Sequence, residues 1–303
     1  MNKLMLLASA GLFFVAPAQA TTVYNTSLPD LNDTRGDGVA TTTTDATGTR
    51  TTVAGSPGGA NRVSAPITAN SWIQANVGSE GTVGITTDYA RSGNGSAYFS
   101  TVNDGSKADL QYYFAGLTTG ASLASLTSVS YDFFRDASST TNPNFAGVLR
   151  LDIAKDGAFA GSLVFENVYQ TQQAAPTDSW TTLTASLDSG IFWATSTALG
   201  PNFANANGGQ KTLQAWIDDN AGANLTVYGL SLGVGSGWGD GQSFTGAIDN
   251  VSLQFAGGPE ISANFEVAAA AVPEPAAWAL MIGGFGLVGG TLRRRSIRDL
   301  AAA

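Results

Sequence analysis

The stretch VLRLDI at residues 148–153 decides the fold class. Its leucines can face one way only if Arg150 and Asp152 face the other, and this period of two is typical of a β-strand with one buried and one solvated face. Between Trp72 and Phe255 the chain repeats the pattern in short segments separated by clusters of Gly, Asn, Asp and Ser. No long helical pattern occurs before residue 268. The sequence therefore predicts an all-β protein.

Ten segments carry the alternation most clearly and are predicted to be strands. They are Thr82–Tyr89, Ser96–Val102, Asp109–Phe114, Val129–Arg135, Val148–Ile153, Ser162–Tyr169, Trp180–Leu187, Thr212–Ile217, Leu225–Val234 and Gly246–Phe255. Turn signals separate them, and such spacing is typical of an antiparallel β-sandwich or barrel. We therefore assign residues 71–257 to one β-sandwich domain.

Two segments beside this domain are predicted to lie outside the sandwich. Residues 21–70 are rich in Thr and Gly, with four consecutive threonines at 41–44, and poor in large apolar side chains. Such a stretch buries too little surface to offset the entropy lost on ordering, so we expect an irregular segment. Residues 258–272 end in a run of alanines before two prolines and are predicted to be a linker.

The N-terminus carries the three parts of a secretory signal peptide. Lys3 gives a basic start, residues 4–15 form an almost unbroken apolar run, and Ala18-Gln19-Ala20 is the small-x-small pattern that a signal peptidase cuts. The apolar run is too short to span a bilayer, which needs roughly 20 residues. We therefore expect residues 1–20 to be removed by signal peptidase on export.

The composition excludes several classes of function. The chain of 303 residues has no Cys and no His, so structural zinc sites, cysteine nucleophiles and Ser-His-Asp triads are excluded. Residues 21–272 hold 21 acidic and 9 basic side chains, a net charge of −12. We expect no nucleic-acid partner, because binding to phosphates depends on Lys and Arg.

The C-terminal end has the pattern of a membrane anchor. Residues 276–292 form an apolar stretch without a charge, about 25 Å long as a helix. The cluster Arg293-Arg294-Arg295 follows it and would stay on the cytoplasmic side, which places the body outside the cytoplasm. Trp278 would lie at the opposite membrane interface. We therefore predict a transmembrane helix at residues 276–292.

The motif Pro273-Glu274-Pro275 precedes this stretch, and together with Trp278, the Gly-rich span and the basic cluster it resembles the PEP-CTERM sorting domain in its PEPxxWA form. The resemblance covers residues 273–298 and leaves 299–303 as a tail. It implies recognition by an exosortase, a membrane protease-transferase, in bacteria that make exopolysaccharide. We expect an exported protein, first anchored in the inner membrane with its body outside the cytoplasm, and then released to the cell surface or the medium.

The predicted sandwich carries a second resemblance. The runs SGNGSAYF at 92–99 and FTGAIDNV at 244–251 resemble an early hairpin and the closing strand of galactose-binding-like or carbohydrate-binding jelly rolls. This resemblance implies a jelly-roll β-sandwich. It also makes calcium a candidate cofactor, since Asp249 matches an aspartate that often helps to hold a structural calcium ion. One Asp cannot supply the roughly six to eight oxygen ligands of calcium, so a turn-capping role for Asp249 is the alternative.

Sugar binding needs aromatic rings on an accessible surface beside polar groups. Trp238 is the candidate, because glycines flank it and leave it little local cover; packing at the sandwich edge is the alternative. Trp193 and Trp216 lie in apolar stretches and are predicted to be core residues.

Three functions fit these observations. The leading expectation is a non-enzymatic protein of the cell envelope or extracellular matrix, associated with exopolysaccharide. A carbohydrate-binding module is the first alternative. A polysaccharide-cleaving enzyme is the second, but it needs two carboxyl groups across the scissile bond. Glu80 and Glu166 are the only glutamates in residues 71–257, and no pattern in the sequence places them together.

Overall fold

The computed structural model describes residues 20–31, 38–55, 61–116, 119–201, 209–235, 237–238, 241–269, 279–288 and 293. The chain divides into two compact units, Met1–Ala268 and Ala269–Ala303. In the first unit the described residues form 18 strands, which make two sheets, and a few short helices. The predicted all-β fold is confirmed, with the two sheets expected of a β-sandwich.

Nine strands form the first sheet, which we call sheet A. They are β1 (Thr21–Tyr24), β2 (Ala40–Asp45), β3 (Gly48–Val53), β6 (Thr82–Thr86), β7 (Ser96–Thr101), β10 (Leu126–Arg135), β13 (Trp180–Ala185), β17 (Phe244–Phe255) and β18 (Glu260–Glu266). The long strand β17 pairs with β10 along one edge, and with β7 and then β18 along the other. Among the paired strands of sheet A that the structure describes, β1 and β18 are parallel and the rest antiparallel.

Nine further described strands form the second sheet, sheet B, and they pair with one another in antiparallel orientation. They are β4 (Arg62–Val63), β5 (Trp72–Gly78), β8 (Lys107–Tyr113), β9 (Ala121–Ser122), β11 (Val148–Lys155), β12 (Ala158–Phe165), β14 (Phe192–Ala194), β15 (Gln210–Lys211) and β16 (Leu225–Val234). The described parts of the connecting segments hold two α-helices and three 3₁₀ helices: α1 (Asn167–Thr171), α2 (Leu213–Asp219), η1 (Asn25–Ser27), η2 (Leu123–Ser125) and η3 (Thr197–Leu199).

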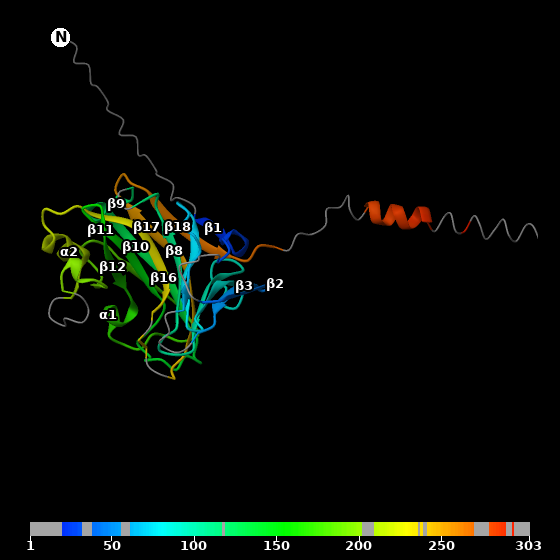
Figure 1. Ribbon diagram of the computed structural model, residues 1–303, viewed down its shortest axis with the longest axis horizontal. Helices are drawn as coiled ribbons and strands as arrows, with labels where there is room; N and C mark the ends of the chain where they lie inside the picture. The colour runs from blue at the N-terminus through cyan, green and yellow to red at the C-terminus, as the bar shows by residue number, and fades with distance from the viewer. Residues whose placement is uncertain are drawn as a thin grey trace, which may run out of the picture. The chain divides into compact units, whose positions relative to one another are not determined.

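The core lies between the inward faces of the two sheets. Leu149 and Leu151 of sheet B are buried in the same cluster as Phe99 and Val129 of sheet A. The tyrosine Tyr131 crosses this core, and its hydroxyl donates to backbone carbonyls on sheet-B segments, including that of Phe165 at 3.1 Å. Figure 1 shows α1 and α2 on one side of the body and the hairpin β2–β3 on the opposite side.

Nine of the ten predicted strands overlap strands of the structure, and β16 has the predicted bounds. The strand prediction for residues 212–217 is wrong, because Thr212 is the N-cap of α2 and residues 213–217 lie in this helix. Leu213 and Trp216 are buried at a spacing of three, as on one face of a helix. The side chain of Thr212 accepts a hydrogen bond from the backbone N–H of Ala215 and so caps the first turn.

The Thr-rich segment at residues 21–70 is not irregular throughout, because β1, β2, β3 and β4 lie within it. In β3, Thr51 and Val53 face the core and are fully buried. Threonine is β-branched and fits a pleated sheet well, so a threonine-rich run can add strands without large apolar side chains. The irregular prediction is therefore corrected for the described part of this segment.

The predicted linker at residues 258–272 also contributes a strand, β18. Ile261, Ala263 and Phe265 are buried and alternate with more exposed polar residues. β18 pairs with both β17 and β1, so it belongs to sheet A and the sandwich extends beyond the predicted boundary.

The predicted terminal segments lie largely outside the described residues. The signal peptide falls there except for Ala20, and so do the sorting residues Pro273, Glu274, Pro275, Trp278, Arg294 and Arg295. In the second unit, residues 279–288 are helical, within the predicted span at 276–292. No helix in the described part of the chain combines the length and the apolar character needed to cross a membrane.

Candidate functional site

A cleft lies on the face of sheet B that points away from sheet A. In β11 the leucines at 149 and 151 point to the core, so the alternation turns Arg150 and Asp152 to the opposite face, where both line the cleft. The cleft has two lobes, of about 530 Å³ and 310 Å³. Lys107, Arg150 and Thr195 line both lobes and mark the junction between them. We call the larger lobe, lined by Tyr113 and Tyr228, the tyrosine lobe, and the smaller, lined by Trp193 and Trp238, the tryptophan lobe.

A buried ion pair lies at the junction. The Nη1 atom of Arg150 donates to the Oδ1 atom of Asp109 at 2.9 Å and to the Oγ atom of Ser231 at 3.1 Å. The second carboxylate oxygen of Asp109 accepts from the Nδ2 atom of Asn76 at 2.9 Å. Pairing across the sheet places Arg150 opposite Ser231, so the register of β11 with β16 sets this geometry. The positions of both charges are thereby fixed by several hydrogen bonds.

A second buried carboxyl group, that of Asp152, lies on the same face of β11 and is 5% exposed. Its Oδ1 atom accepts a hydrogen bond from the hydroxyl of Ser162 at 2.6 Å. Burial raises the pKa of Asp152 to about 6, although the hydrogen bond from Ser162 and the nearby charge of Arg150 act in the opposite direction.

The raised pKa of Asp152 predicts a pH-dependent stability. Between about pH 4 and pH 6 the folded state binds more protons than the unfolded state, so the free energy of unfolding falls as the pH rises through this window. Asp152→Asn keeps the acceptor for Ser162 but cannot ionise. We expect urea unfolding to show equal stability of variant and parent at pH 4, and a variant more stable by about 2 kcal/mol at pH 8.

Burial also raises the pKa of Asp249 to about 6. This carboxyl group therefore also makes the free energy of unfolding fall as the pH rises. The Asp152→Asn variant should therefore keep part of the loss of stability between pH 4 and pH 6. A variant that is less stable than the parent at pH 8 would contradict the assignment of Asp152 as a buried, destabilised carboxylate.

The tryptophan lobe joins aromatic rings to a buried glutamate. The Nε1 atom of Trp193 donates to the Oε1 atom of Glu166 at 2.6 Å. Burial raises the pKa of Glu166, partly offset by this hydrogen bond. The half-buried ring of Trp238 packs against Phe145, with ring centroids 5.4 Å apart, and edge-to-face against Phe244 at 5.2 Å. Trp238 is thus both an edge residue of the core and part of the lobe wall.

The tyrosine lobe carries exposed apolar side chains. The rings of Tyr113 and Tyr228 stack with centroids 5.7 Å apart, and the ring of Phe159 meets Tyr228 edge-to-face at 6.2 Å. Phe159 is 62% exposed and Ile67 is 59% exposed, which is unusual for large apolar residues. The two lobes together form a polar trough with aromatic rings at both ends.

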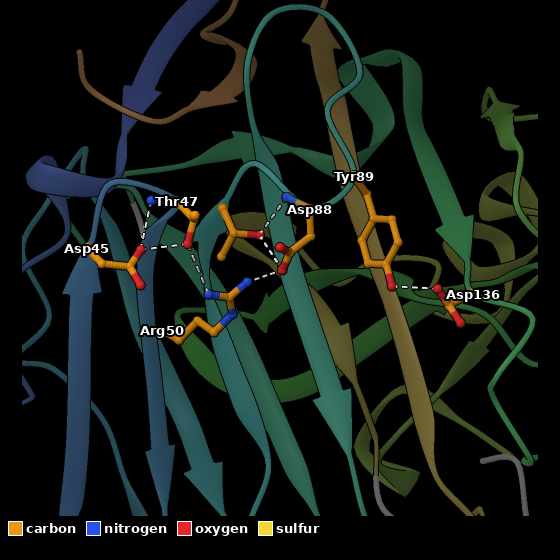
Figure 2. Close-up of polar contacts among 7 residues, drawn as sticks. Asp45, Thr47, Arg50, Asp88, Tyr89 and Asp136 are labelled. Atoms are coloured by element: carbon orange, nitrogen blue, oxygen red, sulfur yellow. Dashed lines mark hydrogen bonds and ion pairs between the residues drawn. The ribbon is translucent and has the colours of Figure 1, made fainter. Parts of the chain in front are cut away.

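The outer face of sheet A also carries aromatic rings, but they contact one another. Tyr89 stacks on Tyr98 and on Phe134, with centroids 6.3 Å and 4.5 Å apart. Figure 2 shows the hydroxyl of Tyr89 at Asp136 and the guanidinium group of Arg50 at Asp88. These polar groups already have partners within the chain, so the cleft on sheet B is the better candidate for a site.

The structure tests the predicted places of the tryptophans. Trp216 is fully buried, as predicted, and its Nε1 atom donates to the carbonyl of Phe192. The core prediction for Trp193 is wrong, because Trp193 lines the cleft. The signal that was missed is its alternation with Phe192 and Ala194, both of which are buried, so that Trp193 must face the other way.

Asp249 is fully buried and binds backbone amides. Its Oδ1 atom accepts from the N–H of Phe265 at 2.9 Å, and its Oδ2 atom accepts from the N–H of Ser92 at 3.3 Å. The next residue, Asn250, has a φ of 50°, and the pairing of β10 with β17 is irregular at this point. Such a bulge changes the direction of neighbouring side chains and turns Asp249 inward. Asp249 therefore ties the loop at residues 91–95 and β18 to β17.

Within the described ranges, no group of three or more Asp or Glu side chains is arranged to hold a metal ion. The calcium interpretation of Asp249 therefore gains no support from its surroundings. No protein-family model matches the chain, and no curated protein is significantly similar to it.

Proposed function

We propose that this chain is an exported, non-enzymatic protein of the bacterial envelope or extracellular matrix, and that it binds a segment of polysaccharide in the cleft on sheet B. The observation that carries the proposal is the trough itself, which places aromatic side chains at both ends of a row of polar and charged groups. The proposal unites the leading expectation from the sequence with its first alternative, a carbohydrate-binding module.

The lining suits a glycan in chemical terms. Pyranose rings have apolar faces that pack on aromatic rings, while their hydroxyl groups need hydrogen-bond donors and acceptors close by. The tryptophan lobe offers Trp238 and Trp193 with Glu166, and the tyrosine lobe offers Phe159.

The spacing of the carboxyl groups supports binding rather than cleavage. Asp152 lies opposite Ser162, and Glu166 follows four residues later, so their backbones are about 14 Å apart along the strand direction. Glycosidases hold the two carboxyl groups within roughly 5–9.5 Å. The remaining cleft carboxylate, Asp109, is already paired with Arg150. A polysaccharide-cleaving enzyme is therefore the weaker hypothesis.

The first test is binding of the host exopolysaccharide by the purified chain in affinity electrophoresis. Trp238→Ala should weaken the binding about tenfold or more, as expected when a central aromatic contact is lost. Trp180→Ala is the matched control, because Trp180 is also a half-buried tryptophan but lies on the outer face of sheet A, against Phe134. Equal binding by both variants and the parent would refute the site.

Export and sorting are the second part of the proposal, and the sequence supports them. The support is the signal-peptide pattern at residues 1–20 and the similarity of residues 273–298 to the PEP-CTERM sorting domain, which includes an apolar stretch long enough to enter a membrane.

The jelly-roll form of the sandwich rests on the similarity of residues 92–99 and 244–251 to strands of carbohydrate-binding jelly rolls. In the structure these two runs lie side by side, because β7 pairs with β17.

Processing gives a direct test of the sorting route. We expect intact-mass measurement of the protein from its native host to show a chain that starts at Thr21 and ends near Pro273, outside the inner membrane. In a strain without the exosortase, the same measurement should show the tail retained up to Ala303 in the inner-membrane fraction. A chain that begins with Met1 in the cytoplasmic fraction would contradict export.

A further inference from the structure

We propose that the cleft on sheet B takes an acidic polysaccharide, and that Lys107 at the junction of the lobes binds the carboxylate group of a uronic acid residue. This inference rests on the proposed function, because it names the class of glycan that the same cleft would bind. It is carried by the position and the surroundings of Lys107.

Basic side chains are concentrated in the cleft. Residues 21–272 hold only nine Lys and Arg side chains against 21 acidic ones, yet Arg62, Lys107 and Arg150 all line the tyrosine lobe. These three side chains come from β4, β8 and β11, so the folding of the sheet brings them together rather than a local basic run. Such a gathering of cations in an acidic body indicates an anionic ligand.

Two of these three cations form no ion pair with any residue that the structure describes. Arg150 forms the ion pair with Asp109. In the described part of the chain, neither Lys107 nor Arg62 forms an ion pair, and the hydrogen bond found for Arg62 goes to the carbonyl of Gly105 at 3.4 Å. Both side chains are half-buried, and partial removal of an unpaired charge from water costs free energy that a bound carboxylate would offset.

The groups around Lys107 agree with this assignment. Burial lowers the pKa of Lys107, and the positive charges of Arg150 and Arg62 act in the same direction, while Asp109 and Asp152 oppose them. Asp109 is neutralised by Arg150, and Asp152 accepts a hydrogen bond from Ser162 instead of forming an ion pair. The tyrosine lobe thus holds three cations, Arg62, Lys107 and Arg150, against two carboxylates, Asp109 and Asp152, so an additional carboxylate beside Lys107 would meet a net charge of +1 there.

The layout of the cleft favours a uronic acid over a dense polyanion. Lys107 lies between two lobes that both carry aromatic rings, so a charged group at the junction would be flanked by apolar surfaces. A uronic acid chain carries its carboxylates one per sugar ring, with apolar ring faces between them. A phosphate polymer or a heavily sulfated chain would bring adjacent charges against the aromatic walls and against a body with a net charge of −12.

The test compares polygalacturonate with the same polymer after its carboxyl groups have been reduced to alcohols. The purified full-length chain should bind the acidic form at least tenfold more tightly at low salt, and the difference should shrink as salt is added. Lys107→Met should remove the preference without abolishing the binding of the reduced polymer. Lys107→Arg should restore most of it, because the positive charge is kept.

Lys155→Met is the matched control, since Lys155 is on the same sheet but its Nζ atom contacts Asn220 and the carbonyl of Ala198 instead of lining the cleft. This variant should keep the full preference. Urea unfolding of each variant verifies that it is folded.

The outcomes separate the two proposals. If both polymers bind equally and Trp238→Ala weakens both, the uronic acid inference fails and the proposed glycan-binding function stands. If neither polymer nor the host exopolysaccharide binds, the proposed function fails. If dextran sulfate competes as well as polygalacturonate, the site is a general anion site and the uronic acid assignment is overturned.

Discussion

Replacing Phe265 by alanine is expected to lower the free energy of unfolding by about 3–5 kcal/mol. Phe265 is fully buried on β18, and its ring meets that of Trp72 edge-to-face with centroids 5.0 Å apart. The truncation would leave a cavity between a strand of sheet A and a strand of sheet B. Urea unfolding followed by tryptophan fluorescence measures the change.

Phe159→Ala is the control for this prediction, because Phe159 is 62% exposed and its removal should change stability by roughly 0.5 kcal/mol or less.

Removal of β18 should prevent folding of the sandwich. A chain that ends at Gly257 lacks β18, exposes one edge of β17 and deprives Asp249 of the N–H of Phe265. It should fail to fold, whereas a cooperative transition of that shortened chain would show that β18 is dispensable.

Replacing Arg135 by methionine is expected to cost about 3 kcal/mol of stability. Arg135 is 2% exposed, and its guanidinium group donates to the carbonyls of Ser139, Thr141 and Phe145 in the loop that follows β10. It also lies over the ring of Phe244. Methionine fills similar space but leaves those carbonyls without a donor, so the loop should loosen.

This loop links stability to binding. Phe145 packs against Trp238 in the tryptophan lobe, so we expect Arg135→Met to weaken glycan binding although Trp238 itself is unchanged. Arg50→Met serves as the control, because Arg50 forms a partly exposed ion pair with Asp88 on the outer face of sheet A and should cost about 1 kcal/mol or less. Full stability of Arg135→Met would show that the loop is held by other contacts.

The strands that the sequence predicts well are those whose apolar side chains alternate over many residues. β16 and β11 are examples, because each has a buried row on one face and small or polar residues on the other. β18 has the same alternation, but its position next to an alanine run and two prolines led to its assignment as a linker. The Thr-rich strands carry no such alternation of polarity, and pairing with neighbouring strands supplies their stability.

Short apolar segments that could form either a helix or a strand are difficult to assign from a few apolar positions. In the segment that forms α2, Leu213 and Ile217 fit one face of a short strand, whereas Leu213, Trp216 and Ile217 together fit one face of a helix. The deciding feature is the cap at Thr212, whose side-chain hydroxyl oxygen accepts a hydrogen bond from the N–H of Ala215 in the first turn. The strand prediction for residues 212–217 is wrong because it leaves out the helix cap at Thr212.

The candidate site was predictable in part. Glycines around Trp238 indicated an accessible ring, but Phe145, which packs against Trp238, and Trp193, which lines the same lobe, come from distant segments. The ion pair of Arg150 with Asp109 joins residues 41 positions apart. The outward direction of Arg150 could be read from the alternation in β11, whereas the neighbours on β8 and β16 follow only from the order of strands in sheet B.

The position of β18 between β17 and β1 has a mechanical consequence. The chain leaves the sandwich at the end of β18, whose backbone is hydrogen-bonded to β17 on one side and to β1 on the other. Tension applied to the following chain along the strand loads all of these hydrogen bonds together, in shear, instead of breaking them one after another. A body pulled by its C-terminal end would therefore resist extraction of its last strand until many hydrogen bonds fail at once.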